Sequence, residues 1–322
     1  MSPLPSILKG MTDSPQPTSA AALAATALST TVPAKARIFD RHLLRRRRDR
    51  AATGFADHDF LIAEVAERLL DRLDDITHRF PLALDLGCRT GQLADLRGGR
   101  GGIETLLQAD LSPAMLRRAR RAGPVVVADE EWLPIRQGSL DLILSNLNLH
   151  WANDLPGALI QIRNALKPDG LFLGTMFGGR TLQELRDCLM RAELAESGGV
   201  SPRVSPFAEV SDAAALMQRA GFALPVVDSE TITVTYGDIM KLLADLRGMG
   251  EANLVVDRLR QPTRRQVIAH AAALYAQDYA NADGRLNATF QVLFLTGWSP
   301  AATQQQPLKP GSGQTNLKDF LA

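Results

Sequence analysis

The chain of 322 residues has a formal net charge of +1 and 45% hydrophobic residues, values typical of a soluble globular protein with one large domain. So small a net charge gives no electrostatic reason to expect nucleic acid or a membrane surface as the main partner. Cys88 and Cys188 are the two cysteines, and they form neither a metal-type spacing nor a disulfide framework, which fits a reducing compartment. No apolar run approaches the ~20 residues that cross a bilayer, so we expect no transmembrane segment.

The N-terminal part divides into a low-complexity segment and two expected helices. Residues 1–34 are rich in Ala, Ser, Thr and Pro and cannot bury a core, so we expect them to be disordered. The basic run from Ile38 to Arg50 is expected to form a solvated helix face at the rim of a ligand pocket. Phe60 to Leu73 carries apolar residues at helical spacing, which predicts an amphipathic helix.

The stretch from Pro81 to Gly91 predicts a buried strand, a glycine-punctuated turn and the start of a helix. This order is the first half of a βαβ nucleotide site, where the ligand lies beyond the carboxyl end of the strand. Gly87 permits a close approach of the ligand to the backbone, and Gly91 lets the helix lie close to the sheet. Asp85 precedes the turn. A carboxylate at this place would repel the phosphate of a dinucleotide, whereas it would attract the ammonium group of a methionyl ligand.

The string Leu84-Asp-Leu-Gly-Cys-Arg-Thr-Gly91 resembles motif I of the class I S-adenosylmethionine (SAM) methyltransferases. The resemblance implies that SAM is the cofactor and that Asp85, Gly87, Cys88 and Gly91 contact it. Arg89 departs from the family pattern, which usually has glycine at this position, and could alter the affinity for the cofactor.

Two further turns continue the pattern. The second strand, expected over Ile103 to Ala109, ends at Asp110, where βαβ folds place an acid that bonds ribose hydroxyls. The string Asp110-Leu-Ser-Pro-Ala-Met-Leu116 is similar to the second methyltransferase motif and implies that Leu111 also lies at the cofactor. A third strand over Pro124 to Ala128 leads to Asp129, which the resemblance makes the candidate for the family's acid at the adenine amino group, with Glu130 as a near alternative.

The fourth strand, Ser139 to Leu144, is followed by Asn146 and His150, which should face the same crevice. Asn146 is a candidate cofactor contact, and His150 is the candidate catalytic residue, although a lone histidine often serves only packing. A helix over Leu155 to Leu166 and a fifth strand over Leu171 to Met176 complete a SAM-binding half at about 76–177. The second half, about 178–300, is expected to hold a strand over Phe222 to Tyr236, a helical insertion over Ile239 to Ala280, and an antiparallel last strand over Asn287 to Trp298.

The fold class is therefore α/β: a Rossmann-like class I methyltransferase fold with a mostly parallel seven-stranded sheet and helices on both faces. One domain is expected over residues 35–300, followed by a loose tail over 301–322. The glycine- and proline-rich loops after Phe177 are expected to build the acceptor site, with Arg180 and Arg203 as candidate substrate contacts. Tight packing around helix ends is the alternative for these loops.

Three motifs from Met176 onward are more specific than the SAM motifs: Met176-Phe-Gly-Gly, Ser201-Pro-Arg-Val-Ser-Pro-Phe207 and Leu246-Arg-Gly-Met-Gly-Glu-Ala-Asn253. They resemble the family of mitochondrial complex I assembly factor 5, which is linked to hydroxylation of an arginine in a complex I subunit. The resemblance implies a protein substrate, modified by methyl transfer or by hydroxylation. Two alternatives stay open, a methyltransferase of a small molecule or of an acyl-carrier-protein-bound carboxylate, and a non-catalytic SAM-binding chaperone.

No metal site is expected, because the five histidines show no His-x-Asp pair. The sequence itself therefore supplies no mechanism for hydroxylation, which rests on the resemblance. The composition of the N-terminus favours the bacterial cytoplasm, with the mitochondrial matrix as the alternative.

Overall fold

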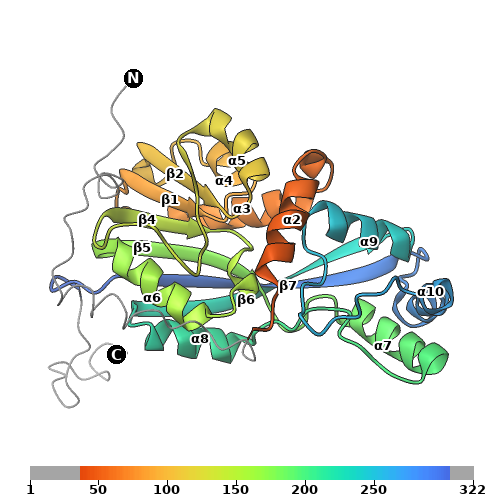
Figure 1. Cartoon of the computed structure of the whole chain (residues 1–322). Helices are drawn as coiled ribbons and strands as arrows, with labels where there is room; N and C mark the ends of the chain where they lie inside the picture. Colours follow the sequence, from red (N-terminus) through yellow and green to blue (C-terminus); the bar gives the residue numbers. More distant parts are fainter. Residues whose placement is uncertain (1–36, 305–322) are drawn as a thin grey trace, which may run out of the picture.

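The computed structural model describes residues 37–304, so the segment 1–34 and most of the tail 301–322 lie outside the described residues. Its seven strands form one sheet in the order β3-β2-β1-β4-β5-β7-β6. All strands run parallel except β7, which lies antiparallel between β5 and β6. The expected mostly parallel sheet is confirmed, and the antiparallel last strand lies beside the edge (Figure 1).

The strands match the short apolar runs of the sequence. Their bounds are Leu82–Leu86 (β1), Thr105–Asp110 (β2), Val125–Val127 (β3), Leu140–Ser145 (β4), Leu166–Phe177 (β5), Ala223–Tyr236 (β6) and Leu286–Trp298 (β7). The start of β5 differs from the expected Leu171. Leu166 already pairs with Leu140. The next pair is Leu142 with Leu171, so the register shifts and the Lys-Pro-Asp-Gly segment between them has no partner in β4.

Helices cover both faces of the sheet. Their bounds are Arg41–Ala51 (α2), Phe60–Asp74 (α3), Gln92–Leu96 (α4), Pro113–Ala119 (α5), Leu155–Ala165 (α6), Gln183–Ser197 (α7), Val210–Arg219 (α8), Ile239–Gly248 (α9) and Arg265–Tyr279 (α10). Within the described residues, single 3-10 turns cover Phe55–Asp57, Arg100–Gly102, Arg120–Ala122 and Leu149–Trp151.

Side-chain alternation along β1 divides the core into two layers, because successive residues of a strand point to opposite faces. Ala83 packs in the layer that contains α3, α7, α9 and α10, whereas Leu84 packs in the layer that contains α6 and α8. Figure 1 shows α7, α9 and α10 together at the far end of the long β6–β7 hairpin. The expected helical insertion is thus α9 and α10, which extend the first layer beyond the parallel part of the sheet.

Candidate functional site: a closed crevice at the carboxyl ends of β1, β2 and β4

Asp85 is the one carboxylate at the centre of this crevice whose two oxygens are both buried without a hydrogen-bond partner among the described residues. The side chain lies at the end of β1 and is 1% exposed. Burial, together with the nearby negative charge of Asp110, raises the pKa of Asp85 to about 8, and the charge of Arg89 opposes this rise. Such a carboxyl group lacks a cationic partner, and a ligand with an ammonium group would supply one.

The turn after β1 brings the backbone close to this carboxylate. Gly87 and Gly91 have φ values of 84° and 98°, a region that strongly favours glycine. A Cβ atom on Gly87 would lie 2.2 Å from Cγ of Asn148, so this position also has no room for a side chain. Cys88 lies in the turn with its thiol buried, and burial raises the pKa of the thiol. The structure therefore brings together the motif residues that the sequence predicted.

Arg89 lies in the same turn, at a φ of 49°, and its side chain points into the protein. Its guanidinium donates to the carbonyl oxygens of Asn146 and Leu147 at 2.8 and 2.6 Å, and to Oε1 of Glu251 at 2.7 Å. The side chain is 1% exposed. Arg89 thus connects the β1 turn to the end of β4 and to the second half of the chain, which a glycine could not do.

Asp110, at the end of β2, is fully engaged with the protein. Its Oδ1 accepts from the backbone N–H of Ser112 at 2.7 Å, and its Oδ2 accepts from the backbone N–H of Arg89 at 3.1 Å. Oδ2 also accepts from Arg48 of α2 at 3.3 Å. The neighbouring Leu111 is half-buried against a small apolar cluster that includes Phe39 of the N-terminal segment.

Helix α2 therefore lies over the crevice, as the sequence predicted. The prediction that its basic side chains are all solvated is only partly correct. Arg48 is 1% exposed and also donates to Oδ1 of Asn148 at 2.7 Å. The prediction failed for this residue because a guanidinium can be buried where a carboxylate and an amide oxygen accept from it. Several of the remaining arginines of α2 are exposed, as predicted.

The two candidate acids after β3 are held by Arg41, also from α2. Its guanidinium lies 2.6 Å from Oδ1 of Asp129 and 2.6 Å from Oε1 of Glu130. Burial alone would raise the pKa of Glu130, but the charge and the hydrogen bond of Arg41 outweigh it and lower that pKa to about 2. Glu130 is therefore the buried, ionised member of the pair, and Asp129 is the more exposed one.

Asn146 and His150, after β4, are both buried and both bonded to the protein. Asn146 donates to the carbonyl oxygen of Ile62 at 2.8 Å and accepts from the Thr175 hydroxyl at 2.9 Å. His150 Nε2 lies 3.0 Å from Oε2 of Glu251, and Nδ1 has no partner among the described residues. Burial lowers the pKa of His150, although Glu251 opposes this effect.

Glu251 is the site residue that the sequence analysis missed. Its Oε1 accepts from Arg89, and its Oε2 accepts from Trp151 Nε1 at 2.8 Å and contacts His150. Burial opposes ionisation, but the hydrogen bond from His150 and the charge of Arg89 lower the pKa of Glu251 to about 2. The sequence did mark the motif Leu246 to Asn253, which contains Glu251. It gave no indication that the Glu251 side chain reaches the crevice.

The two predicted substrate contacts lie apart from this network. Arg180 is exposed, and its backbone N–H donates to Gln291. Arg203 forms an ion pair with Glu193 of α7 at 2.5 Å and donates to the Thr263 hydroxyl at 2.9 Å. Both stay predictions as substrate contacts, and Arg203 also fixes its loop to α7.

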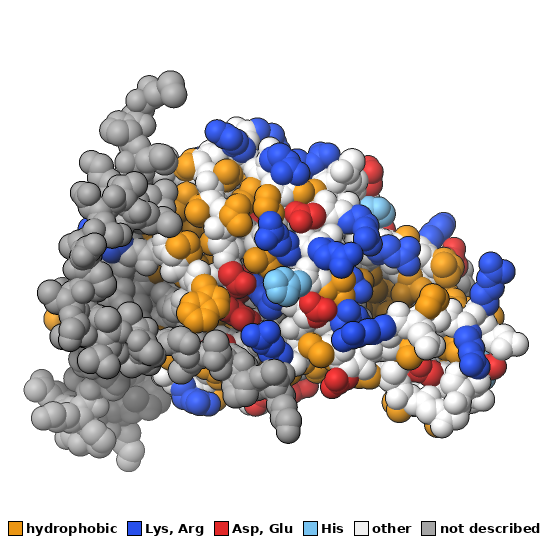
Figure 2. Space-filling model, viewed as in Figure 1, with side chains coloured by type: hydrophobic (Ala, Val, Ile, Leu, Met, Phe, Trp, Pro, Cys, Tyr) orange, Lys and Arg blue, Asp and Glu red, His pale blue; other side chains and the backbone are white. Residues whose placement is uncertain are grey.

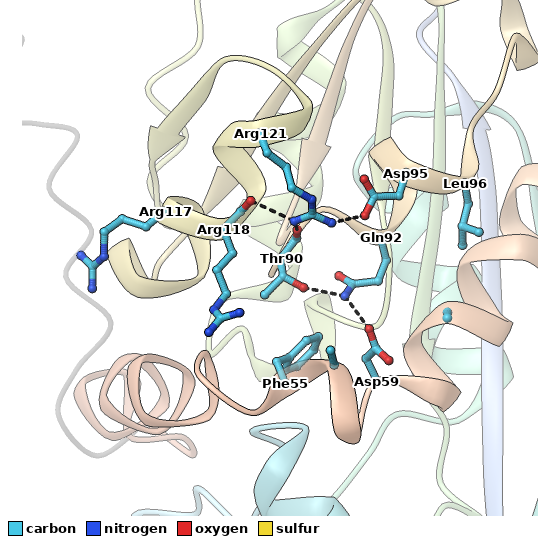
Figure 3. A pocket seen from close by; sticks show the side chains of 11 residues that line it. Phe55, Asp59, Thr90, Gln92, Asp95, Leu96, Arg117, Arg118 and Arg121 are labelled. Carbon is cyan, nitrogen blue, oxygen red and sulfur yellow. Dashed lines mark hydrogen bonds and ion pairs between the residues drawn. The ribbon is translucent and has the colours of Figure 1, made fainter.

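The space around Asp85 is too small for a water molecule. A second cavity of about 650 Å³ lies next to it and is open to the surface (Figure 3). Gln92 lines both cavities and donates to Thr90 Oγ1 at 2.6 Å and to Asp59 Oδ2 at 2.9 Å, as Figure 3 shows. The Gln92 side chain therefore separates the open cavity from the closed crevice.

Residues 37–304 contain neither a metal-type cluster nor a membrane-spanning helix. No group of three or more His, Cys, Asp or Glu side chains is placed to hold a metal ion in this part of the chain. Within the same residues, no helix combines the length and apolar character that crossing a membrane requires.

Comparison with known proteins agrees with this geometry. A methyltransferase domain family model matches residues 84–174, the part that contains β1, β2 and β4. Two solved structures share the fold: YcgJ of Bacillus subtilis, with a TM-score of 0.51 and 16% identity, and BH2331 of Bacillus halodurans, with a TM-score of 0.52 and 13% identity. Each alignment covers 73% of this chain and 99% of the other. The chain is a member of the class I SAM-dependent methyltransferase superfamily.

Its curated relatives narrow this class. Arginine-hydroxylase NDUFAF5 of Homo sapiens is 43% identical over 90% of this chain and 85% of its own length. The Danio rerio protein of the same name is 41% identical over 88% and 89%. Malonyl-[acyl-carrier protein] O-methyltransferase of Halorhodospira halophila is 35% identical over 85% and 93%. The chain belongs to the methyltransferase-fold family that contains the NDUFAF5 proteins, and it is related to the malonyl-carrier methyltransferases.

At one end the residues of the crevice have the chemistry that SAM requires, although the closed space there must widen to admit it. The unpartnered carboxylate of Asp85 suits the methionyl ammonium, and the Gly87 turn gives access to the backbone. At the adenosyl end, Asp110 and Glu130 have the right chemistry for hydroxyl and amino groups, but Arg48 and Arg41 already bond to them. Binding of the whole cofactor therefore requires the crevice to open, with α2 as the element that covers it.

Proposed function

We propose that this protein is a SAM-dependent enzyme that modifies a protein, a subunit of respiratory complex I during assembly. The buried, unpartnered carboxylate of Asp85 at the end of β1 is the observation that carries SAM binding. The protein target is supported by the identity to NDUFAF5 proteins over nearly the whole chain, including the segment that supplies Glu251 to the crevice. Those relatives are named arginine-hydroxylases, so we expect an arginine of the partner to be modified here, by hydroxylation or by methyl transfer.

When bound, SAM supplies a methyl group on a positively charged sulfur. The protein's own part is then to orient cofactor and acceptor and to accept the proton that the acceptor loses. His150 is our candidate proton acceptor. Since Nε2 faces the ionised carboxylate of Glu251, the ring proton belongs on Nε2, which leaves the lone pair of Nδ1 free. The lowered pKa of His150 keeps the ring neutral, and therefore basic, at neutral pH.

A second candidate is methyl transfer to a carrier-bound carboxylate, which the relation to malonyl-[acyl-carrier protein] O-methyltransferases favours. A carboxylate acceptor is already ionised and needs no proton acceptor, so this reaction would not depend on His150. The two candidates can therefore be separated with one variant as well as by their substrates.

Mass spectrometry of the complex I peripheral arm, purified from cells with and without this gene, tests the proposal. Loss of a mass equal to one oxygen atom on an arginine indicates hydroxylation, and loss of a mass equal to one methylene group indicates methylation. An unchanged arm, together with formation of S-adenosylhomocysteine from SAM and malonyl-acyl carrier protein, would instead establish the second candidate. For localisation we propose the cytoplasm of a bacterium, with the mitochondrial matrix, the location in the relatives' names, as the alternative.

A further inference from the structure

Two adjoining cavities lie on the other side of α2, between this helix, α9 and the segment 249–264. Their volumes are about 680 and 410 Å³, and both are lined by Arg47, Arg247 and Ala252. We call them together the arginine groove. Figure 2 shows Lys and Arg side chains gathered over the junction of α2 and α9.

The groove concentrates positive charge in a chain whose formal net charge is only +1. No Asp or Glu is among the described residues that line either cavity, whereas six arginines line them: Arg47, Arg50, Arg203, Arg247, Arg258 and Arg260. A carboxylate-free surface of this kind attracts anionic groups and raises their local concentration.

Most of this charge is not neutralised by the residues that the structure describes. Arg203 pairs with Glu193, and Arg258 lies 3.5 Å from Asp40. Arg47 donates only to the carbonyl oxygens of Ala252 and Asn253, at 2.7 and 2.5 Å. Burial and the neighbouring charges of Arg258 and Arg50 lower the pKa of Arg47, as expected where cations crowd together.

The other three arginines of the groove have fewer contacts with the described residues than Arg47, Arg203 and Arg258 have. Arg50, Arg247 and Arg260 are exposed, and their side chains form no hydrogen bond or ion pair to any described residue. Their guanidinium groups are therefore available to bind two carboxylate oxygens at once, the geometry that arginine favours.

The walls between the arginines are aliphatic. Leu43, Leu189, Met240, Leu243 and Ile268 line the larger cavity, and no Phe, Tyr or Trp is among the described residues that line either one. Single-stranded nucleic acid binds positive grooves by stacking its bases on aromatic rings, so this groove lacks what nucleic acid needs. Alternating cations and aliphatic surface instead complement a peptide in which acidic and aliphatic side chains are mixed.

The groove adjoins the crevice through two chain segments. Arg47, in the groove, precedes Arg48, which bonds to Asp110 in the crevice. Ala252 follows Glu251, which bonds to Arg89 of the β1 turn. A ligand in the groove would thus lie next to α2 and next to the segment with Glu251, the two parts of the chain that close the crevice.

We infer that the arginine groove binds an acidic, aliphatic-rich segment of the protein partner, and that this segment presents the partner to the crevice. The inference rests on the proposed function only in taking the partner to be a protein. Peptide binding in the groove can be measured without knowledge of the reaction and separately from SAM binding.

The test is fluorescence anisotropy with the full chain and a labelled peptide in which Glu and Leu alternate with Ser and Gly. Charge reversal by Arg247→Glu with Arg260→Glu should weaken binding at least tenfold and reduce its dependence on salt. The matched control, Arg136→Glu with Arg219→Glu, reverses two exposed arginines outside the groove and should bind as the wild type does. A peptide with Gln in place of Glu should not bind.

Separate outcomes overturn the inference. They are failure of the wild type to bind the Glu/Leu peptide, equal loss in the control variant, and tighter binding of single-stranded RNA or of inorganic phosphate than of the peptide. Calorimetric titration with SAM accompanies each variant, because both double variants should retain SAM affinity. A wild type that binds the peptide but not SAM would contradict the proposed cofactor and leave the groove established.

Discussion

Arg89 and Glu251 form a buried ion pair, with Nη2 of the guanidinium 2.7 Å from Oε1 of the carboxylate and both side chains at most 2% exposed. The pair joins the turn after β1 to the segment after α9. Since Glu251 also accepts from Trp151 and contacts His150, this one carboxylate connects three segments around the crevice. Such a pair is costly to break from one side, because the remaining charge stays buried.

Replacement of Glu251 by Ala should therefore lower the free energy of unfolding by about 3–5 kcal/mol, measured by urea denaturation. Glu104→Ala removes an exposed carboxylate and should change it by no more than about 0.5 kcal/mol. The free energy of unfolding of the double variant Arg89→Gly with Glu251→Ala should fall by much less than the sum of the decreases in the two single variants. In the double variant no unpaired charge of this pair stays buried. Additive losses would show that the two residues do not act as a pair.

Asp85 should make the cofactor-free protein less stable as the pH rises. Its pKa is about 8 in the folded chain, whereas an unfolded aspartate titrates near ~3.9, so the folded state binds more protons between these values. The contribution of Asp85 to the free energy of unfolding therefore falls from about pH 4 to about pH 8. Asp85→Asn, which cannot ionise, should be more stable than the wild type at pH 8 by up to about 5 kcal/mol.

Denaturation curves of the two proteins at pH 5 and pH 8, taken without SAM, measure this difference, and it should be small at about pH 4–5. Asp257→Asn, at an exposed aspartate, is the control and should follow the wild type at both values. An Asp85→Asn variant that is less stable than the wild type at pH 8 would mean that the carboxylate has a partner in solution.

His150→Gln should separate chemistry from cofactor binding. If the free Nδ1 accepts the acceptor's proton, the variant should bind SAM as the wild type does, and its kcat should fall by about 10²–10⁴. The wild-type rate should also fall on acidification through the lowered pKa of His150, and the variant should lose this limb of the pH profile. An unchanged kcat would assign His150 to packing and favour a carboxylate acceptor.

The sequence predicted the sheet and the turns well because both depend on local signals. Short apolar runs that end in Gly or Asp specify strands and turns within a few residues, and they correctly placed Asp85 between the ends of β2 and β4, near Asp110 on one side and Asn146 on the other. The early start of β5 was missed because Leu166 joins the sheet through its pairing with Leu140, which the local Lys-Pro-Asp-Gly signal does not reveal.

The closure of the crevice could not be predicted in this way. It depends on ion pairs between distant residues, Arg48 with Asp110 and Arg89 with Glu251, and periodicity gives no information about such pairs. Arg48 belongs to a run of arginines in which no pattern distinguishes the buried member from the exposed ones. Arg89 was noted as a departure from the family turn, but its acid partner lies in a different part of the sequence.

Calorimetric titration with SAM of the wild type, Asp85→Asn and Asp257→Asn tests the central claim most directly. Loss of a hydrogen bond to a charged group costs about 1.5–3 kcal/mol, so SAM should bind Asp85→Asn roughly ten- to a hundredfold more weakly than the other two. The unfolding curve of Asp85→Asn shows in parallel that the variant is folded. Equal affinity of a folded Asp85→Asn variant, or no binding by the wild type, would contradict the assignment of the crevice to SAM.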